Sequence, residues 1–158
     1  MIYECERRLQ IEAPAEAVWD WMSDLRRLLG LNRFHVGVDG TRPVTEVGQC
    51  VPIRHNVFGL YRRVRVARIR AYRRYHVAWG ELQEHGKDWF PHSQSFTILP
   101  VDSRRCTVVN RLRGKFLLPA ARYWLLPFYR RLAPRILDEE NRSIAAHVSE
   151  TPLARKSP

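Results

Sequence analysis

The chain has 158 residues, of which 45% are hydrophobic and 27% are charged. Its length suits a single domain, and its apolar content excludes a wholly disordered chain because it suffices for a hydrophobic core. No apolar run approaches the ~20 residues that cross a bilayer.

The balance of charge is unusual. Lys and Arg number 27 against 16 Asp and Glu, which gives a formal net charge of +11. Such a charge favours acidic partners, namely nucleic acid, an anionic membrane or an anionic ligand. Because almost all of these cations are Arg, codon usage in a GC-rich genome is an equally simple explanation.

The first residues are charged from Glu4 onward, so no secretory signal is expected. Cys5, Cys50 and Cys106 are widely separated, and this spacing favours neither a disulfide framework nor a zinc site. We expect a cytoplasmic protein with reduced thiols, and neither a metal nor another cofactor.

The first predicted elements are a strand and two short helices. Residues 3–12 alternate between apolar and polar side chains, which predicts a strand. Pro14 suits the first turn of a helix, and apolar residues from Ala17 to Leu25 recur at helical spacing. Residues 28–31 predict a second, shorter helix.

The middle of the chain alternates between strands and turns. Strands are predicted at residues 34–38, 49–58, 63–71, 75–81, 92–99 and 106–116. Most of the connections are short, so an antiparallel meander is the simplest topology.

The last third predicts a long helix over residues 117–148. Pro127 and Pro134 lie seven residues apart within it, so both lost hydrogen bonds fall on one side and should bend it. The alternative is a short helix to Leu126 followed by a longer one. We expect one domain over residues 1–150 and a disordered tail over residues 151–158.

This order of elements, together with three sequence motifs, resembles the START / polyketide-cyclase (SRPBCC, birch-pollen-allergen-like) superfamily. The motifs are LQIEAPAEAVW at residues 9–19, RRYHVAW at residues 73–79, and FTI at residues 96–98 followed by CTV at residues 106–108. The resemblance implies an α+β helix-grip fold, in which a curved antiparallel sheet of about seven strands wraps around a long C-terminal helix, with two short helices after the first strand. It also implies a cavity for a lipid, sterol, polyketide or quinone-like ligand.

Counting by twos along the strands identifies candidate cavity residues. His92 and Gln94 share a face with Phe96, Asn110 shares a face with Val108, and Trp79 points inward with Val77. A few polar groups in an apolar wall are typical of a pocket for a small organic ligand. The alternative places His92 and Gln94 at a solvated strand end and Asn110 on a bulge.

Acid–base catalysis needs a histidine or carboxylate held close to the substrate. His92 is the best candidate, and His55 is second because it lies in a predicted strand. The sequence contains no nucleophile elbow and no phosphate-binding glycine loop.

Arginines are concentrated around residues 62–74. The apolar residues change parity between Val66 and Ala67, which predicts a bulge there and a basic stripe on the convex face. Without the bulge, Arg68 and Arg70 would point into the cavity and select an anionic ligand.

A second basic and aromatic zone covers residues 111–131. Arginines and aromatic rings can bind a membrane interface or stack on bases. We favour the alternative that Tyr123 and Trp124 form a lid over the cavity or part of the core.

We predict a protein that binds a hydrophobic or aromatic small molecule between sheet and C-terminal helix. The predicted ligand-binding residues are Trp79, His92, Gln94, Phe96, Val108, Asn110 and Tyr123. One alternative is a cyclase or dehydratase-type enzyme in which His92 moves a proton. Another is a basic adaptor for an anionic membrane or RNA, with nucleic acid the less favoured partner.

Overall fold

Seven antiparallel strands form one sheet in the order β1-β7-β6-β5-β4-β3-β2. The computed structural model describes residues 1–150 except 41, 58, 60, 83–89 and 118, so the predicted tail lies outside the described residues. The strands are β1 Ile2–Ile11, β2 His35–Val38, β3 Cys50–Val57, β4 Tyr61–Arg73, β5 His76–Glu81, β6 His92–Pro100 and β7 Cys106–Lys115. The predicted meander is confirmed from β2 to β7, and β1 closes the sheet beside β7.

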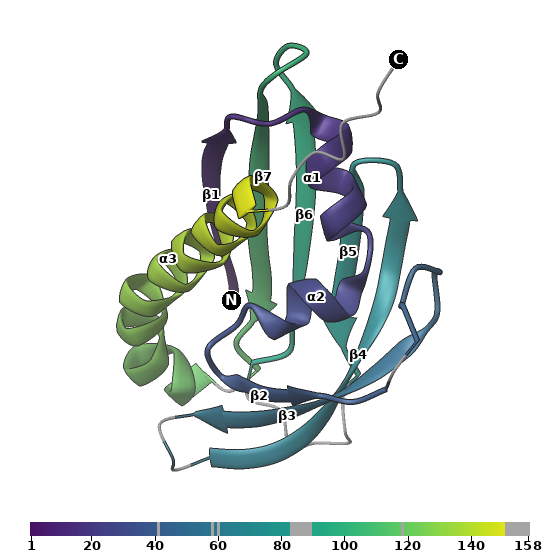
Figure 1. The fold of residues 1–158 in the computed structure, drawn as a ribbon. Coiled ribbons are helices and arrows are strands. Elements are labelled where there is room, and N and C mark those ends of the chain that lie inside the picture. Colours follow the sequence, from purple (N-terminus) through teal and green to yellow (C-terminus); the bar gives the residue numbers. More distant parts are fainter. Residues whose placement is uncertain (41, 58, 60, 83–89, 118, 151–158) are drawn as a thin grey trace, which may run out of the picture.

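Three helices cover one face of this curved sheet (Figure 1). They are α1 Ala15–Met22, α2 Leu25–Gly30 and α3 Pro119–Glu150. Helix α2 begins earlier than predicted because Asp24 caps it: the Asp24 carboxylate accepts hydrogen bonds from the backbone N–H groups of Arg26 and Val44, both at 3.0 Å. The same carboxylate therefore ties α2 to the segment before β3.

Helix α3 runs through Pro127 and Pro134 without a break. Its axis bends between the green first turns and the yellow-green last turns in Figure 1. The predicted single, bent helix is therefore confirmed, and the alternative prediction of two separate helices is wrong. The bend lets one helix follow the curved sheet.

The predicted bulge between Val66 and Ala67 is wrong. The register of β3 against β4 is continuous from Val57↔Tyr61 to Cys50↔Arg68. The irregularity lies at Arg70, between the pairs Ile69↔Trp79 and Ala71↔Ala78 of β4 and β5. The apolar parity was misleading because Val64 is exposed on the outer face of the sheet.

Arg65 consequently faces the interior, in phase with Ala67 and Ile69. Its side chain is only 14% exposed. Arg68 and Arg70 are exposed, so the cavity receives a different arginine from the two that the sequence analysis considered.

The main core lies between the sheet, α1, α2 and the last turns of α3. A second, smaller core of aromatic residues joins Tyr3, Phe90 and Phe116 to Ala133 of α3.

Candidate functional site

A cavity of about 490 Å³ lies between the sheet and α3. This volume falls within the range of small-molecule pockets, ~300–1,000 Å³. Helix α3 lines it at helical spacing with Leu125, Phe128, Tyr129, Leu132, Ala133, Ile136, Leu137 and Glu140. The other walls contribute Asn32, Phe34, His35, His55, Arg65, Phe90, His92, Gln94 and Leu112. An apolar wall with a few polar groups therefore surrounds the space.

Glu140 forms the first polar cluster of the cavity wall. Its Oε1 accepts a hydrogen bond from the Asn32 amide at 3.0 Å. Its Oε2 accepts from Asn110 Nδ2 at 2.8 Å and from Gln94 Nε2 at 2.5 Å. Gln94 Nε2 also donates to Asn110 Oδ1 at 2.8 Å. Three amides from α2–β2, β6 and β7 thus hold one carboxyl group of α3.

Burial raises the pKa of Glu140 to about 7, and the amide donors partly oppose this shift because they favour the charged form. Glu140 is almost fully buried. A buried carboxyl group with a pKa near neutrality can either accept or donate a proton.

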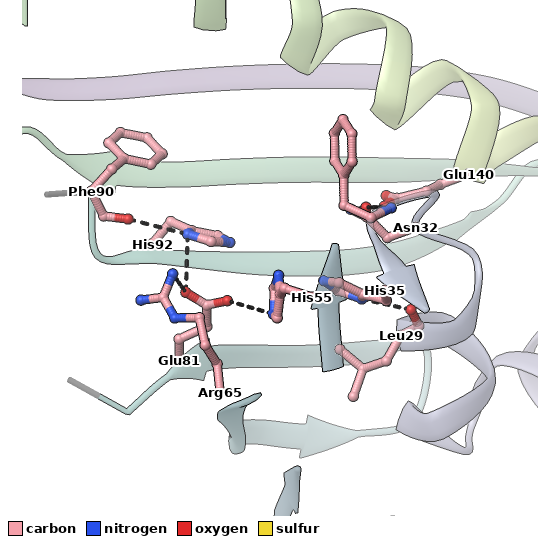
Figure 2. A network of polar contacts seen from close by, with 10 residues as sticks. Leu29, Asn32, His35, His55, Arg65, Glu81, Phe90, His92 and Glu140 are labelled. Atoms are coloured by element: carbon pink, nitrogen blue, oxygen red, sulfur yellow. Dashed lines mark hydrogen bonds and ion pairs between the residues drawn. The ribbon is translucent and has the colours of Figure 1, made fainter. Parts of the chain in front are cut away.

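Glu81 forms the second polar cluster (Figure 2). Its carboxylate lies 2.7 Å from Arg65 Nη1 and 3.4 Å from both His55 Nε2 and His92 Nδ1. The Glu81 side chain is completely buried. This carboxylate therefore compensates the charge of Arg65 and orients two imidazoles.

His35 lies beside His55, with ring centroids 4.6 Å apart. Burial lowers the pKa of His35 to about 4, and burial, reinforced by the nearby His35, Arg65 and His92, lowers the pKa of His55 to about 3. Both imidazoles are therefore neutral near pH 7.

The hydrogen-bond partners fix which ring nitrogen carries the proton. His35 Nδ1 lies 2.7 Å from the Leu29 carbonyl oxygen, and His92 Nδ1 lies 3.3 Å from the Phe90 carbonyl oxygen. A carbonyl accepts, so each Nδ1 carries the hydrogen and each Nε2 is left as an acceptor. In His55 the nitrogen nearest to Glu81 is Nε2, at 3.4 Å.

The aromatic core closes one side of the cavity. The Phe90 ring packs against Gly114 of β7, where a Cβ atom would lie only 2.2 Å from the ring. Its centroid lies 4.3 Å from that of Tyr129 and 4.6 Å from that of Phe116. The Tyr3 hydroxyl donates to the Tyr129 carbonyl oxygen at 3.0 Å, which holds this part of α3 on β1.

The residues predicted from the sequence lie in three places. His92 and Gln94 line the cavity. Asn110 is buried behind them and reaches the cavity through Glu140. Trp79, Phe96 and Val108 are buried in the main core, where the Trp79 ring centroid lies 6.0 Å from that of His92.

Tyr123 lies elsewhere, on the outer surface of α3, and it is 66% exposed. Trp124 is 84% exposed. The favoured prediction that these two residues form a lid or core is therefore wrong, because the helical positions that face the sheet are Leu125, Tyr129 and Leu132.

Sequence reasoning missed Glu140, Glu81, His35, Asn32 and the inward position of Arg65. The inward positions of two of these residues could have been inferred from the sequence. Glu140 follows Leu137 by three residues and precedes Ile144 by four, so it falls in the apolar stripe of α3. Glu81 follows Trp79 by two residues on the inward face of β5.

Within the described residues, no group of three or more His, Cys, Asp or Glu is placed to hold a metal ion. None of the described helices is both long and apolar enough to span a membrane.

The chain matches no protein-family model and no curated protein sequence. Solved structures do resemble it. A START superfamily protein from Mycobacterium smegmatis has a TM-score of 0.70 and 16% identity, over 92% of this chain and 97% of the other. The Zhui aromatase/cyclase from Streptomyces sp. R1128 has a TM-score of 0.71 and 16% identity over the whole of both chains.

Norcoclaurine synthase from Thalictrum flavum is also similar, with a TM-score of 0.67 and 13% identity over 93% of this chain and 96% of the other. The chain therefore has the helix-grip fold that START proteins, aromatase/cyclases and norcoclaurine synthase share, as its sequence predicted. At these identities the likeness defines the fold, and function has to be argued from the site.

Proposed function

We propose that this protein binds a hydrophobic or aromatic small molecule in the cavity between the sheet and α3. The observation that carries the proposal is an apolar cavity of about 490 Å³ whose polar groups converge from β2, β3, β4, β6, α3 and the loop before β2. Apolar burial supplies affinity at roughly 25 cal/mol per Å², and the polar groups orient the ligand.

The polar groups favour a ligand with hydroxyl substituents. His35 and His92 each direct the acceptor nitrogen Nε2 away from the backbone carbonyl that binds Nδ1. Glu140 adds a carboxyl group farther along the wall. A flat apolar body with O–H groups satisfies these acceptors, which fits a polyketide-like or reduced quinone-like ligand better than a plain hydrocarbon chain.

A displacement experiment tests binding. The probe is 1-anilinonaphthalene-8-sulfonate, whose fluorescence rises in an apolar pocket, and the competitors are aromatic phenols and their methyl ethers. We expect saturable displacement, with methylation weakening the competitor about tenfold, the loss of one or two buried hydrogen bonds. Equal competition by phenols and by their methyl ethers would show that the polar groups of the cavity do not contribute to binding.

A cavity-filling variant locates the ligand. Leu132→Trp places a large ring in the cavity, whereas Leu99→Trp places the same ring at an exposed position. We expect Leu132→Trp to abolish saturable binding while its circular dichroism stays that of the parent, and Leu99→Trp to bind normally. If Leu132→Trp fails to fold, Ile136→Phe makes the same test with a smaller change. Binding that survives both cavity variants would contradict the proposed site.

A cyclase or dehydratase-type enzyme is the second candidate, and the observation that favours it is the pair His92 and Glu140. The Nε2 of His92 can take a proton from a carbon between two carbonyl groups. The resulting carbanion attacks a ketone carbon farther along the same chain, which closes the ring, and protonated Glu140 gives its proton to the alkoxide oxygen that forms. Elimination of water then leaves the ring unsaturated. The similar aromatase/cyclase structures support this candidate.

The two candidates are separated by variants that keep the cavity. His92→Asn and Glu140→Gln should lose turnover of a poly-β-ketone and retain ligand affinity within about threefold if the protein is an enzyme. Absence of turnover in the parent would reject the catalytic function and leave the binding one. Turnover by the parent that both variants keep would show that neither His92 nor Glu140 is catalytic.

A further inference from the structure

The most exposed aromatic residues of the described chain lie together at the start of α3. Trp124 is 84% exposed, Tyr123 is 66% exposed and Phe128 is 42% exposed. Leu117, just before the helix, is also exposed. Large apolar side chains on a soluble surface mark an interaction site when they cluster. We call Leu117, Tyr123, Trp124, Phe128, Arg130 and Arg131 the rim surface.

The rim surface is strongly cationic. Residues 103–137 contain nine Arg and Lys and no Asp or Glu. Arg105, Arg111 and Arg113 pair with carboxylates, whereas Arg130, Arg131 and Arg135 form no ion pair with any residue that the structure describes. These three arginines are exposed.

Helical geometry puts the rings and the charges on one face. Trp124, Phe128, Arg131 and Arg135 follow each other at intervals of four, three and four residues, which is one stripe of an α-helix. The neighbouring stripe, with Leu125, Tyr129 and Leu132, lies about 100° around the helix and lines the cavity. Each stripe of the helix therefore has a different environment.

We propose that the rim surface docks on an anionic phospholipid bilayer. Trp and Tyr are the side chains that favour the boundary between head groups and hydrocarbon, and exposed arginines beside them meet the lipid phosphates. Two copies of this chain would not pair through this surface, because their arginines would repel each other. Leu117 is aliphatic and exposed, which suits contact with hydrocarbon better than stacking on the bases of RNA.

Docking in this way would bring the bilayer to the cavity. Phe128 belongs to both surfaces, because it lines the cavity and is 42% exposed. A molecule dissolved in the membrane would then reach the cavity without crossing water. The docking itself does not depend on which ligand the cavity holds, so it is tested without one.

Vesicle sedimentation tests the proposal with the full chain. The vesicles contain equal amounts of phosphatidylglycerol and phosphatidylcholine, or phosphatidylcholine alone. We expect binding to the anionic vesicles only, and release as the salt is raised from about 0.05 M to about 0.5 M, because the Debye length shortens to a few ångströms. Absence of binding to anionic vesicles at low salt would overturn the proposal.

Matched variants separate the rim surface from the net charge. Arg130→Gln with Arg131→Gln removes two rim charges, and Arg62→Gln with Arg68→Gln removes two exposed charges of β4. The Arg130→Gln/Arg131→Gln variant should bind vesicles about fivefold more weakly for each charge removed. The Arg62→Gln/Arg68→Gln variant should lose clearly less affinity. Equal losses would show that binding follows net charge alone, which would contradict docking by this surface.

Trp124 gives the direct readout. Lipids brominated on their acyl chains should quench tryptophan fluorescence of the parent on anionic vesicles, and Trp124→Phe should remove most of that quenching. Trp124→Ala should weaken binding, whereas Val64→Ala, at an exposed position of β4, should not. Unchanged quenching in Trp124→Phe would overturn the proposal, and so would a dimer that Trp124→Ala dissociates or a preference for RNA over vesicles.

Discussion

Arg65 of β4 and Glu81 of β5 form a buried ion pair of 2.7 Å at the wall of the cavity. They are not opposite each other in the sheet, because the register partner of Glu81 is Ala67. Arg65 lies two residues farther along the same face, and its long side chain spans the diagonal. The pair therefore places a guanidinium group at the cavity without leaving its charge uncompensated.

Removing one partner should be much worse than removing both. Glu81→Leu leaves Arg65 without its carboxylate and should lower the free energy of unfolding by about 3–5 kcal/mol. The double variant Arg65→Met with Glu81→Leu should recover most of that loss, since no charge stays behind. Urea unfolding of the three proteins measures this.

An exposed ion pair serves as the control. Asp102 and Arg105 lie 2.6 Å apart on the surface, and Asp102→Asn should change the unfolding midpoint far less than Glu81→Leu. A double variant no more stable than Glu81→Leu would show that Arg65 does not depend on Glu81.

Glu140 should make stability fall as the pH rises. Its folded pKa of about 7 lies above the ordinary value of 4.5, so the folded state holds a proton that the unfolded state has released. Its contribution is complete below about pH 4.5 and is lost as the pH rises to about 7, an effect of about 3 kcal/mol. Glu140→Gln does not titrate, so its stability relative to the parent should rise across this interval.

Urea unfolding at several pH values measures that difference. Glu139→Gln is the control for loss of one carboxylate, since Glu139 pairs with Arg33 at the surface at 3.5 Å. If the difference in unfolding free energy between Glu140→Gln and the parent stays constant from pH 4.5 to pH 7, Glu140 does not have the raised pKa of a buried carboxyl group.

His35 and His55 should act in the opposite direction. Their folded pKa values, about 4 and about 3, lie below the ordinary 6.5, so the unfolded state binds protons that the folded state does not. Their contribution is present above about pH 6.5 and is lost as the pH falls toward 4. Histidine NMR titration should show both rings neutral at pH 5.5. If either ring titrated near pH 6.5, it would be exposed to water and not buried against the other ring.

Gly114 should resist even a small side chain. Gly114→Ala forces the Phe90 ring out of its packing with Phe116 and Tyr129 and should cost about 1–3 kcal/mol of unfolding free energy. Gly30→Ala is the control, because nothing lies within 4 Å of its added Cβ at the end of α2. Thermal unfolding compares the two. A Gly114→Ala protein as stable as Gly30→Ala would mean that the ring moves without cost.

Much of the fold was predictable because apolar alternation and helical spacing are local. Counting by twos placed Gln94 and Asn110 on the inward face, and both are buried. The same method failed in β4, where Val64 lies outside and Arg65 inside. Valines are common on both faces of a strand, so only a partner such as Glu81 decides the phase.

The two polar clusters of the site were not predictable as clusters. Glu140 and Asn32 are 108 residues apart in the sequence, and they meet only because of the way that α3 packs across the sheet. Arg65 and Glu81 meet on a diagonal that depends on the β4–β5 register. The exposure of Trp124 likewise depends on which stripe of α3 faces the sheet, and the aromatic residues alone do not define that stripe.

The two prolines of α3 affect the stability of the helical wall of the cavity. Neither Pro127 nor Pro134 has a backbone N–H, so each removes one rung from the helical ladder. The part of α3 before Ile136, which lines the cavity with Leu125, Phe128, Tyr129, Leu132 and Ala133, is therefore less strongly bonded than the part from Ile136 to Val148. Its amide protons should exchange with solvent first, and this wall of the cavity should also open first to release the proposed ligand.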